Sequence, residues 1–182
     1  MVPLVLAGCA TDGGATRDGA QIKKDQFSST IIIVGPPAAL NPYGDTAREW
    51  FLKSRMDEKT HAVATQLYVD VNYVGGWRWY GTAADRSASK LTLDRLGSRV
   101  DACFGAGVCS RHEMVGVELD GGKLRSCVLD GYTVRLGAKS GESLTVTVAP
   151  AQIHAQLAAL AKLGALPASA PPRRPEAPSD AC

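Results

Sequence analysis

The chain has 182 residues, of which 45% are hydrophobic and 21% charged, and its formal net charge is +2 at pH 7. This length supports one hydrophobic core rather than two. The nearly balanced charge excludes the strongly basic surface that nucleic-acid binding requires. We therefore expect one ordinary globular domain that binds no nucleic acid.

The chain begins with an apolar run, residues 2–6, which leads into the tetrapeptide Leu6-Ala7-Gly8-Cys9. This order resembles the lipobox of bacterial lipoproteins, in which the cysteine carries acyl chains and becomes the mature N-terminus. The resemblance implies that Cys9 anchors the protein to a membrane on the periplasmic side of the envelope, at the outer membrane. Export signals open with basic residues, but none precedes Arg17. We therefore expect residues 1–9 to be a truncated signal segment, the alternative being a cytosolic protein whose N-terminus happens to be apolar.

Both ends of the chain are expected to lack regular structure. Residues 10–26 are rich in Gly and Asp and poor in apolar side chains, which is typical of a flexible tether. Residues 165–182 hold five prolines among Ala and Ser, a composition that disfavours both helix and sheet. A single domain is therefore expected at residues 27–164.

Within this domain the dominant hydrophobic period is two residues, the period of half-buried strands. Residues 48–56 and 61–73 alternate in this way and are joined by a polar tetrapeptide, which predicts a hairpin. Further strands are expected at residues 31–34, 77–80, 90–96, 113–119, 132–136 and 143–148, with turns at Asp120-Gly121-Gly122 and Lys139-Ser140-Gly141. An amphipathic helix is expected at about residues 150–163. The prediction is a mainly β fold, an antiparallel meander forming a sandwich or open barrel with one C-terminal helix.

The cysteines fit disulfide bonds in an exported protein. Cys103 and Cys109 are the best pair, because the two glycines between them allow the backbone to turn sharply. Cys127 lies in a segment that we expect to be an apolar strand, and it is either a buried free thiol or the partner of the terminal Cys182. The cysteine spacing is not that of a zinc motif, and His112 is the only histidine nearby, so we expect no metal or cofactor.

The chain has none of the common catalytic motifs. His112-Glu113 begins like the paired-histidine zinc motif, but the fourth residue after His112 is Gly116. His112 could act as an acid or base with a distant carboxylate, which leaves a hydrolase as one alternative. A single histidine on a strand is more often structural, and we expect no catalytic residue.

Five aromatic residues fall between Tyr68 and Tyr80, although aromatic residues make up only 6% of the chain. Trp77 and Trp79 would share one face of a strand, and we expect that face to lie in the core. Arg78 and Tyr80 would then face outward, where Tyr68 joins them. These three residues form the predicted contact patch, in which the guanidinium group suits a carboxylate or phosphate.

Three segments, residues 66–69, 76–80 and 151–157, resemble uncharacterised lipoproteins of proteobacteria, and the resemblance extends over about residues 50–163. This resemblance implies a location in the cell envelope and does not indicate any enzymatic activity. We therefore expect a non-catalytic, lipid-anchored binding or structural module of the cell envelope, with a protein or glycan partner. A carrier of an acyl chain or another small apolar ligand is the first alternative, and a hydrolase that uses His112 is the second.

Overall fold

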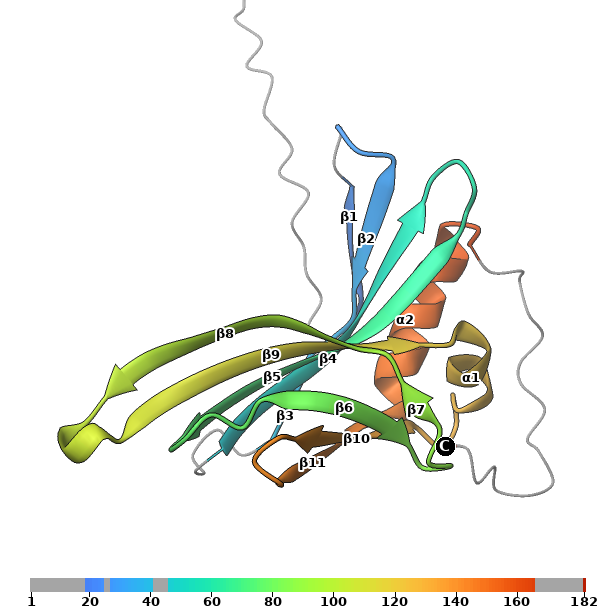
Figure 1. The fold of residues 1–182 in the computed structure, drawn as a ribbon. Coiled ribbons are helices and arrows are strands. Elements are labelled where there is room, and N and C mark those ends of the chain that lie inside the picture. The colour runs from blue at the N-terminus through green and yellow to red at the C-terminus, as the bar shows by residue number, and fades with distance from the viewer. Residues whose placement is uncertain (1–18, 25–26, 41–45, 166–181) are drawn as a thin grey trace, which may run out of the picture.

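Two antiparallel β-sheets form most of the structure (Figure 1). The structure is a computed structural model, and it describes residues 19–24, 27–40, 46–165 and 182. The larger one, sheet A, has seven strands in the order β1-β2-β4-β5-β9-β8, and β3 pairs with another part of β4. Its strands are β1 (Gln21–Lys24), β2 (Thr30–Val34), β3 (Ala38–Leu40), β4 (Thr46–Asp57), β5 (Val63–Val74), β8 (Leu93–Cys103) and β9 (Cys109–Leu119). The predicted mainly β, antiparallel fold is confirmed.

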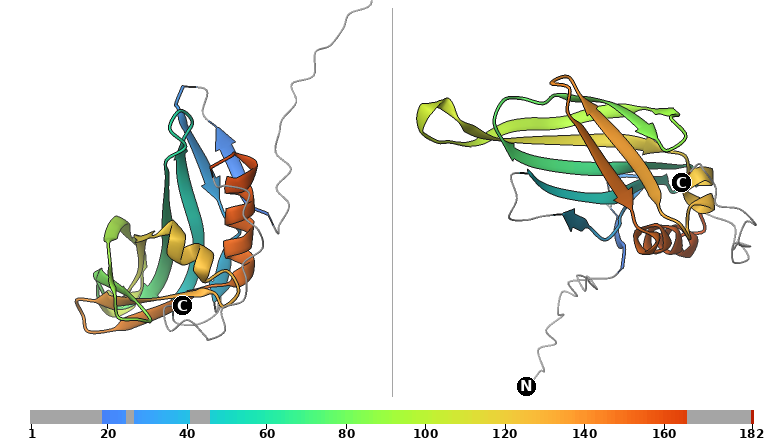
Figure 2. Two further views of the ribbon diagram at one scale, coloured as in Figure 1. Left: turned by 90° about the vertical axis from the view of Figure 1, so that its right-hand side faces the viewer. Right: turned by 90° about the horizontal axis from the view of Figure 1, so that it is seen from below.

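The smaller one, sheet B, has the order β11-β10-β6-β7. Its strands are β6 (Tyr80–Asp85), β7 (Lys90–Leu91), β10 (Tyr132–Ala138) and β11 (Ser143–Val148). Figure 2 shows the β10–β11 hairpin lying across one face of sheet A. The indole nitrogen of Trp50 in β4 donates a hydrogen bond to the Thr147 carbonyl of β11 at 3.0 Å, which ties the two sheets together.

The core follows from strict alternation along the strands. On β5, Leu67, Val69, Val71 and Tyr73 are buried against sheet B, and Val115 and Val117 of β9 face the same way. Burying aliphatic side chains of this size contributes about 1.5–3 kcal/mol each. Strand β4 pairs with β5 antiparallel up to Met56 and Val63, so the hairpin predicted from alternation is confirmed.

Helix α2 (Pro150–Lys162) covers the part of the same face that sheet B leaves open, over β2 and β4. Its Leu160 packs in a second cluster with Ile33 and Met56. Gln156, which is buried, donates from Nε2 to the Ser54 hydroxyl at 2.8 Å, so the helix is also fixed by a polar contact. This is the helix predicted at about residues 150–163. No helix within the described ranges is long and apolar enough to cross a bilayer.

Three local expectations differ from the structure. Gln21–Lys24, inside the predicted tether, pairs with β2 as strand β1. Asp120-Gly121-Gly122, expected to be a turn, starts the short helix α1 (Gly121–Ser126), because the Asp120 carboxylate accepts the Lys123 N–H at 2.8 Å as an N-cap. Cys127 is therefore the C-cap of a helix rather than a strand residue. Residues 1–18, which include Cys9, and residues 166–181 of the tail predicted at 165–182 lie outside the described residues.

Candidate functional site: a tryptophan-arginine stack

The chain passes from sheet A to sheet B through residues 75–79, which join β5 to β6. This segment was predicted to begin a strand, and that prediction is wrong. Trp79 has a φ of 54°, in the left-handed region that a bulky side chain rarely adopts. Such a conformation persists only where the surroundings stabilise it.

The side chain that stabilises the segment is Glu113 of β9, which is 3% exposed. Its Oε1 accepts the N–H groups of Arg78 at 3.1 Å and Trp79 at 3.0 Å, and its Oε2 accepts the N–H of Tyr80 at 3.1 Å. The Tyr73 hydroxyl donates a further hydrogen bond to Oε1. Successive N–H groups therefore converge on one carboxylate instead of pairing with a strand, which explains why the segment is not extended.

Tyr73 supports the carboxylate from β5. Burial, followed by the hydrogen bond to Glu113, raises the pKa of Tyr73 to about 12. The phenol therefore stays protonated at neutral pH and keeps donating its hydrogen bond. The Arg78 guanidinium lies over the Tyr73 ring, 4.2 Å from its centroid.

The constrained segment brings two indole rings into contact. The rings of Trp77 and Trp79 stack with centroids 4.8 Å apart. The guanidinium of Arg111 lies 4.6 Å from the Trp77 centroid, and that of Arg95 lies 5.7 Å from the Trp79 centroid. The contacts therefore run in the order Arg111-Trp77-Trp79-Arg95. We call these four residues the tryptophan-arginine stack.

Each outer arginine of the stack donates a hydrogen bond to a backbone carbonyl through Nε alone. Arg95 donates from Nε to the Tyr80 carbonyl at 3.0 Å, and Arg111 donates from Nε to the Gly75 carbonyl at 2.6 Å. Among the described residues, their terminal nitrogens meet no hydrogen-bond acceptor. Each guanidinium is thus oriented by the protein while its outer donors remain open to a carboxylate or phosphate.

A small cavity of about 170 Å³ opens beside this stack. It lies where β8 bulges against β9, because the pairing register shifts between Arg95 and Gly97. Its lining residues are Trp79, Arg95, Leu96, Gly97, Ser98, Glu113, Met114 and Val115. One outer arginine of the stack thus lines a recess that can take a small group.

The predicted contact patch is contradicted for two of its three residues. Tyr80 is 1% exposed and belongs to the core, and Tyr68 is 8% exposed on the outer face of sheet A. Phe51 stacks on the Tyr68 ring at 5.4 Å, and the Lys53 ammonium lies 4.8 Å from its centroid. Arg78 is partly exposed and bonded to the Tyr80 hydroxyl at 3.4 Å. The predicted faces are reversed, because the tryptophans are half-buried at the surface and Tyr80 points inward.

His112 lies on the outer face of sheet A between two carboxylates. Its Nε2 is 2.8 Å from Asp70 Oδ1, and its Nδ1 is 3.8 Å from Asp101 Oδ2. The first two atoms are close, but the direction of the ring nitrogen falls outside hydrogen-bond geometry. Asp101 is also held by Arg99, whose Nε donates to Oδ1 at 2.6 Å. The arrangement is a surface charge network, and His112 lines none of the cavities described here.

The four cysteines in the described ranges form two disulfides. Cys103 and Cys109, the predicted pair, face each other across β8 and β9 with Cα atoms 4.0 Å apart. Cys127 bonds to Cys182, which settles the alternative that the sequence left open. No group of three or more potential metal ligands occurs in the described part of the chain.

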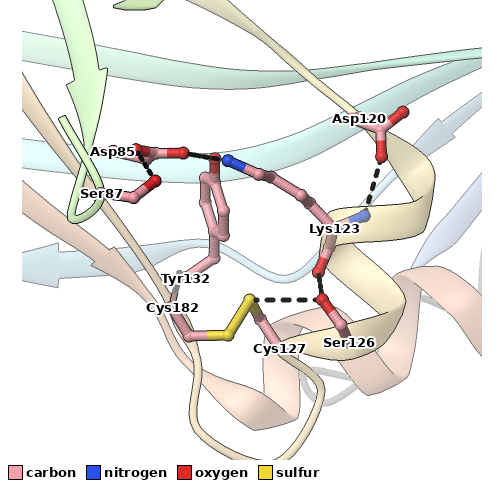
Figure 3. The surroundings of a disulfide bond; sticks show 8 residues. All are labelled: Asp85, Ser87, Asp120, Lys123, Ser126, Cys127, Tyr132 and Cys182. Carbon is pink, nitrogen blue, oxygen red and sulfur yellow. Dashed lines mark hydrogen bonds and ion pairs between the residues drawn. A yellow bond between two sulfur atoms is a disulfide. The ribbon is translucent and has the colours of Figure 1, made fainter. Parts of the chain in front are cut away.

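A charge pair with one fully buried partner lies beside the second disulfide (Figure 3). Lys123 of α1 reaches the carboxylate of Asp85, whose side chain is fully buried at the end of β6. Burial alone would raise the pKa of Asp85, but hydrogen bonds from Lys123, Ser87 and the Ser89 backbone outweigh it and lower the pKa to about 2. Burial also raises the pKa of the adjacent Tyr132, which donates to Asp85 at 3.3 Å. The pair fastens α1 to sheet B.

A cleft of about 520 Å³ lies at the opposite end of β5 from the stack, between sheet A and the two helices. Its apolar lining residues are Leu52, Val63, Ala64, Leu119, Leu124, Ile153, Leu157, Leu160 and Ala165. Lys53, Arg55 and Arg125 line it as well, with Glu118 and Asp120. Its size falls within the range of small-molecule sites.

Sequence reasoning found the aromatic segment but missed Arg95, Arg111 and Glu113. The signal for Glu113 was a carboxylate at an inward-facing position of an alternating strand, where a buried charge requires several donors. The two arginines had no local signal, because they meet the indole rings only through the pairing of β8 and β9. Comparison of the chain with models of protein families, with curated proteins and with solved structures finds no match.

Proposed function

We propose that this protein is a non-catalytic binding module of the bacterial cell envelope, anchored by lipid at Cys9 on the periplasmic side of the outer membrane. Its ligand-binding surface is the tryptophan-arginine stack, and its ligand is an acidic glycan of the envelope. The observation that carries this proposal is the pair of oriented guanidinium groups of Arg95 and Arg111, whose terminal nitrogens bond no acceptor in the described part of the protein.

The chemistry of the stack favours anions over flat neutral sugars. Neutral sugars usually bind on an open aromatic face, but each indole ring in the stack already contacts the other ring and an arginine. The groups that remain are guanidinium N–H donors and the indole N–H groups of Trp77 and Trp79, which meet no acceptor among the described residues. Donors of this kind suit carboxylates or phosphates together with hydroxyls.

A glycan also fits the surface better than a folded protein partner. Stable protein interfaces place exposed aromatic residues in a desolvated apolar centre. In the stack, the indole rings contact one another and the arginines, so they leave little aromatic area for a partner protein. An acidic polymer needs little apolar area, because its affinity comes from charge-assisted hydrogen bonds spaced along the chain. The two outer arginines, separated by two rings, offer such spaced contacts.

Equilibrium titration with oligogalacturonate, a polymer of carboxylate sugars, tests the binding proposal. Arg95→Gln with Arg111→Gln should weaken binding at least about tenfold, since two charge-assisted contacts are lost. Arg135→Gln, an exposed arginine on sheet B, is the matched control and should bind like the wild type. Neutral dextran should not bind. Equal affinity of the double variant and the wild type would contradict the assignment of the stack.

The anchor requires a separate test, because Cys9 lies outside the described residues. Cys9→Ala, expressed with a complete export signal, should move the protein from the membrane fraction to the soluble periplasmic fraction. Radiolabelled palmitate should be incorporated into the wild type and not into Cys9→Ala, and absence of label from the wild type would contradict acylation as the anchor. The outcome of this anchor test does not affect the glycan titration, because the titration uses soluble protein.

The cleft between sheet A and α2 favours a second candidate function, that of a carrier for a small amphiphile. Apolar side chains from sheet and helices line it, and Arg125 of α1 could pair with an acidic head group. A fluorescent fatty acid titrated into the protein tests this candidate. Leu157→Trp, which fills the cleft from the half-buried face of α2, should abolish binding if the cleft is the site. Unchanged binding in this variant would exclude the cleft.

A further inference from the structure

The hairpin of β8 and β9 ends in a tip that extends beyond both sheets (Figures 1 and 2). Seven residues, 103–109, form this tip and contain no charged side chain. The Cys103–Cys109 disulfide joins the two strands at its base, and a 3₁₀ turn, Gly105–Gly107, closes its end. The tip is therefore a rigid, uncharged projection.

Apolar side chains surround the tip instead of forming one flat face. Those exposed most are Phe104 at 59%, Val74 at 50%, Val100 at 46% and Val108 at 43%. Val74 pairs with Ser110 of β9, whereas Val100 pairs with the next residue, Arg111. Adjacent strand positions point to opposite faces of a sheet, so these two valines lie on opposite sides of the hairpin. A folded partner would need a socket around the tip, whereas a fluid lipid phase adapts to it.

Part of the tip's backbone is already hydrogen-bonded. Phe104 donates its N–H to the Val108 carbonyl at 2.7 Å, and Gly75 donates to the Cys109 carbonyl at 3.0 Å. Unpaired backbone groups are the main cost of moving a loop out of water into a lipid environment. Internal pairing reduces that cost for this loop.

Arginines and an indole ring lie where the tip joins the sheet. Arg99 of β8 is exposed and, among the described residues, bonds Asp101 through Nε alone, and Arg111 of β9 stacks on Trp77. Cationic side chains attract anionic head groups, and tryptophan favours the boundary between lipid and water. From the tip toward the sheet, apolar side chains are followed by an aromatic ring and arginines, which matches the change in polarity across a bilayer interface.

We propose that residues 103–109 insert into the interface of an anionic phospholipid bilayer. Phe104 and Val108 enter the acyl region, and Arg99 and Arg111 contact head-group phosphates. This contact goes beyond the acyl anchor and the glycan surface of the proposed function; it shares Arg111 with the glycan surface, but it needs neither the anchor nor a bound glycan. It gives the module a second attachment, which would fix its orientation on the membrane.

Flotation with phospholipid vesicles tests the proposal on the full chain with Cys9→Ser, which removes any acylation. The protein should float with vesicles that contain anionic phospholipid and less with purely zwitterionic ones. Phe104→Ser should weaken partitioning about tenfold, as expected for the loss of one buried aromatic side chain. The matched control is Phe27→Ser, because Phe27 is 88% exposed between β1 and β2, at the other edge of sheet A. This control should float like the parent.

A second variant reports the insertion directly. Phe104→Trp should show a blue-shifted emission on anionic vesicles and quenching by brominated acyl chains. Absence of flotation, equal losses in Phe104→Ser and Phe27→Ser, or an unshifted and unquenched Phe104→Trp would each overturn the proposal. Self-association that Phe104→Ser abolishes, without flotation of the parent, would assign the tip to a contact between two copies and overturn it as well.

Discussion

Replacing Glu113 with glutamine tests the element on which the stack depends. The carboxylate accepts hydrogen bonds from the Tyr73 hydroxyl and from three successive backbone N–H groups, those of residues 78–80. Glutamine keeps one acceptor oxygen but presents an NH₂ group where the second oxygen stood. At least one backbone N–H then faces another donor inside the protein.

The expected cost follows from these contacts. A hydrogen bond to a charged group contributes about 1.5–3 kcal/mol, and a buried donor left unsatisfied costs about 1–3 kcal/mol. We therefore expect Glu113→Gln to lower the free energy of unfolding by about 2–4 kcal/mol, which corresponds to a midpoint roughly 6–12 °C lower for a domain of this size. The stacking of Trp77 on Trp79 should weaken, because the segment that carries both rings is no longer held.

Urea unfolding and near-ultraviolet circular dichroism of the tryptophans measure the two effects. Glu118→Gln is the matched control, since Glu118 is exposed on the same strand, and its effect should stay within about 0.5 kcal/mol. If Glu113→Gln unfolds like the control and keeps the wild-type dichroism, the hydrogen bonds to Glu113 do not organise the segment, and the reasoning is refuted.

Three further predictions concern stability. The pKa of Asp85 is lowered from 3.8 to about 2. Ionised Asp85 therefore adds to the free energy of unfolding above pH 4, and this contribution disappears between about pH 4 and 2. Because Lys123 is partly exposed to solvent, the contribution amounts to about 1–2 kcal/mol. Lys123→Met should therefore flatten the acid limb of a stability-pH profile, and an unchanged limb would refute the pairing. Cys182→Ser opens the bond to Cys127 across a separation of 55 residues and should cost up to about 4 kcal/mol by chain entropy, whereas no loss under non-reducing conditions would contradict that bond. Gly131→Ala should cost about 1–3 kcal/mol in urea unfolding, because φ is +83° and the new Cβ would lie 2.8 Å from a β11 carbonyl, and wild-type stability would show that the turn differs.

Local patterns predicted the parts of the fold that local forces determine. The hairpin of β4 and β5 follows from alternation interrupted by a polar turn, and helix α2 follows from an apolar stripe that begins at Pro150. The bond between Cys103 and Cys109 follows from a short glycine-containing loop. In each case the partner residues lie close in sequence, so their spacing carries the information.

The aromatic segment was predicted wrongly because its conformation depends on a distant residue. Alternation placed Trp77 and Trp79 in the core, but Glu113, more than 30 residues further along the chain, draws the intervening N–H groups to itself. Trp79 then takes a left-handed conformation, and Tyr80 enters the core in place of the tryptophans. Long-range hydrogen bonding overrides the local period here.

Tyr68 shows a related difficulty. Its position on the outer face of sheet A was predicted correctly, but its exposure was not. Phe51 and Lys53 of the neighbouring strand cover its ring. Facing away from the core is therefore not equivalent to being accessible, because cross-strand neighbours can bury an aromatic ring on either face.

Photocrosslinking in intact cells tests most directly the claim that the stack binds an acidic glycan of the envelope. A photoreactive residue replacing Ser98, which lines the small cavity beside Arg95, should capture an acidic glycan, and Arg95→Gln should abolish the product. The same residue replacing Thr145, exposed on β11 of sheet B, is the control and should capture none. Equal products at the two positions, or a Ser98 product that survives Arg95→Gln, would contradict the account.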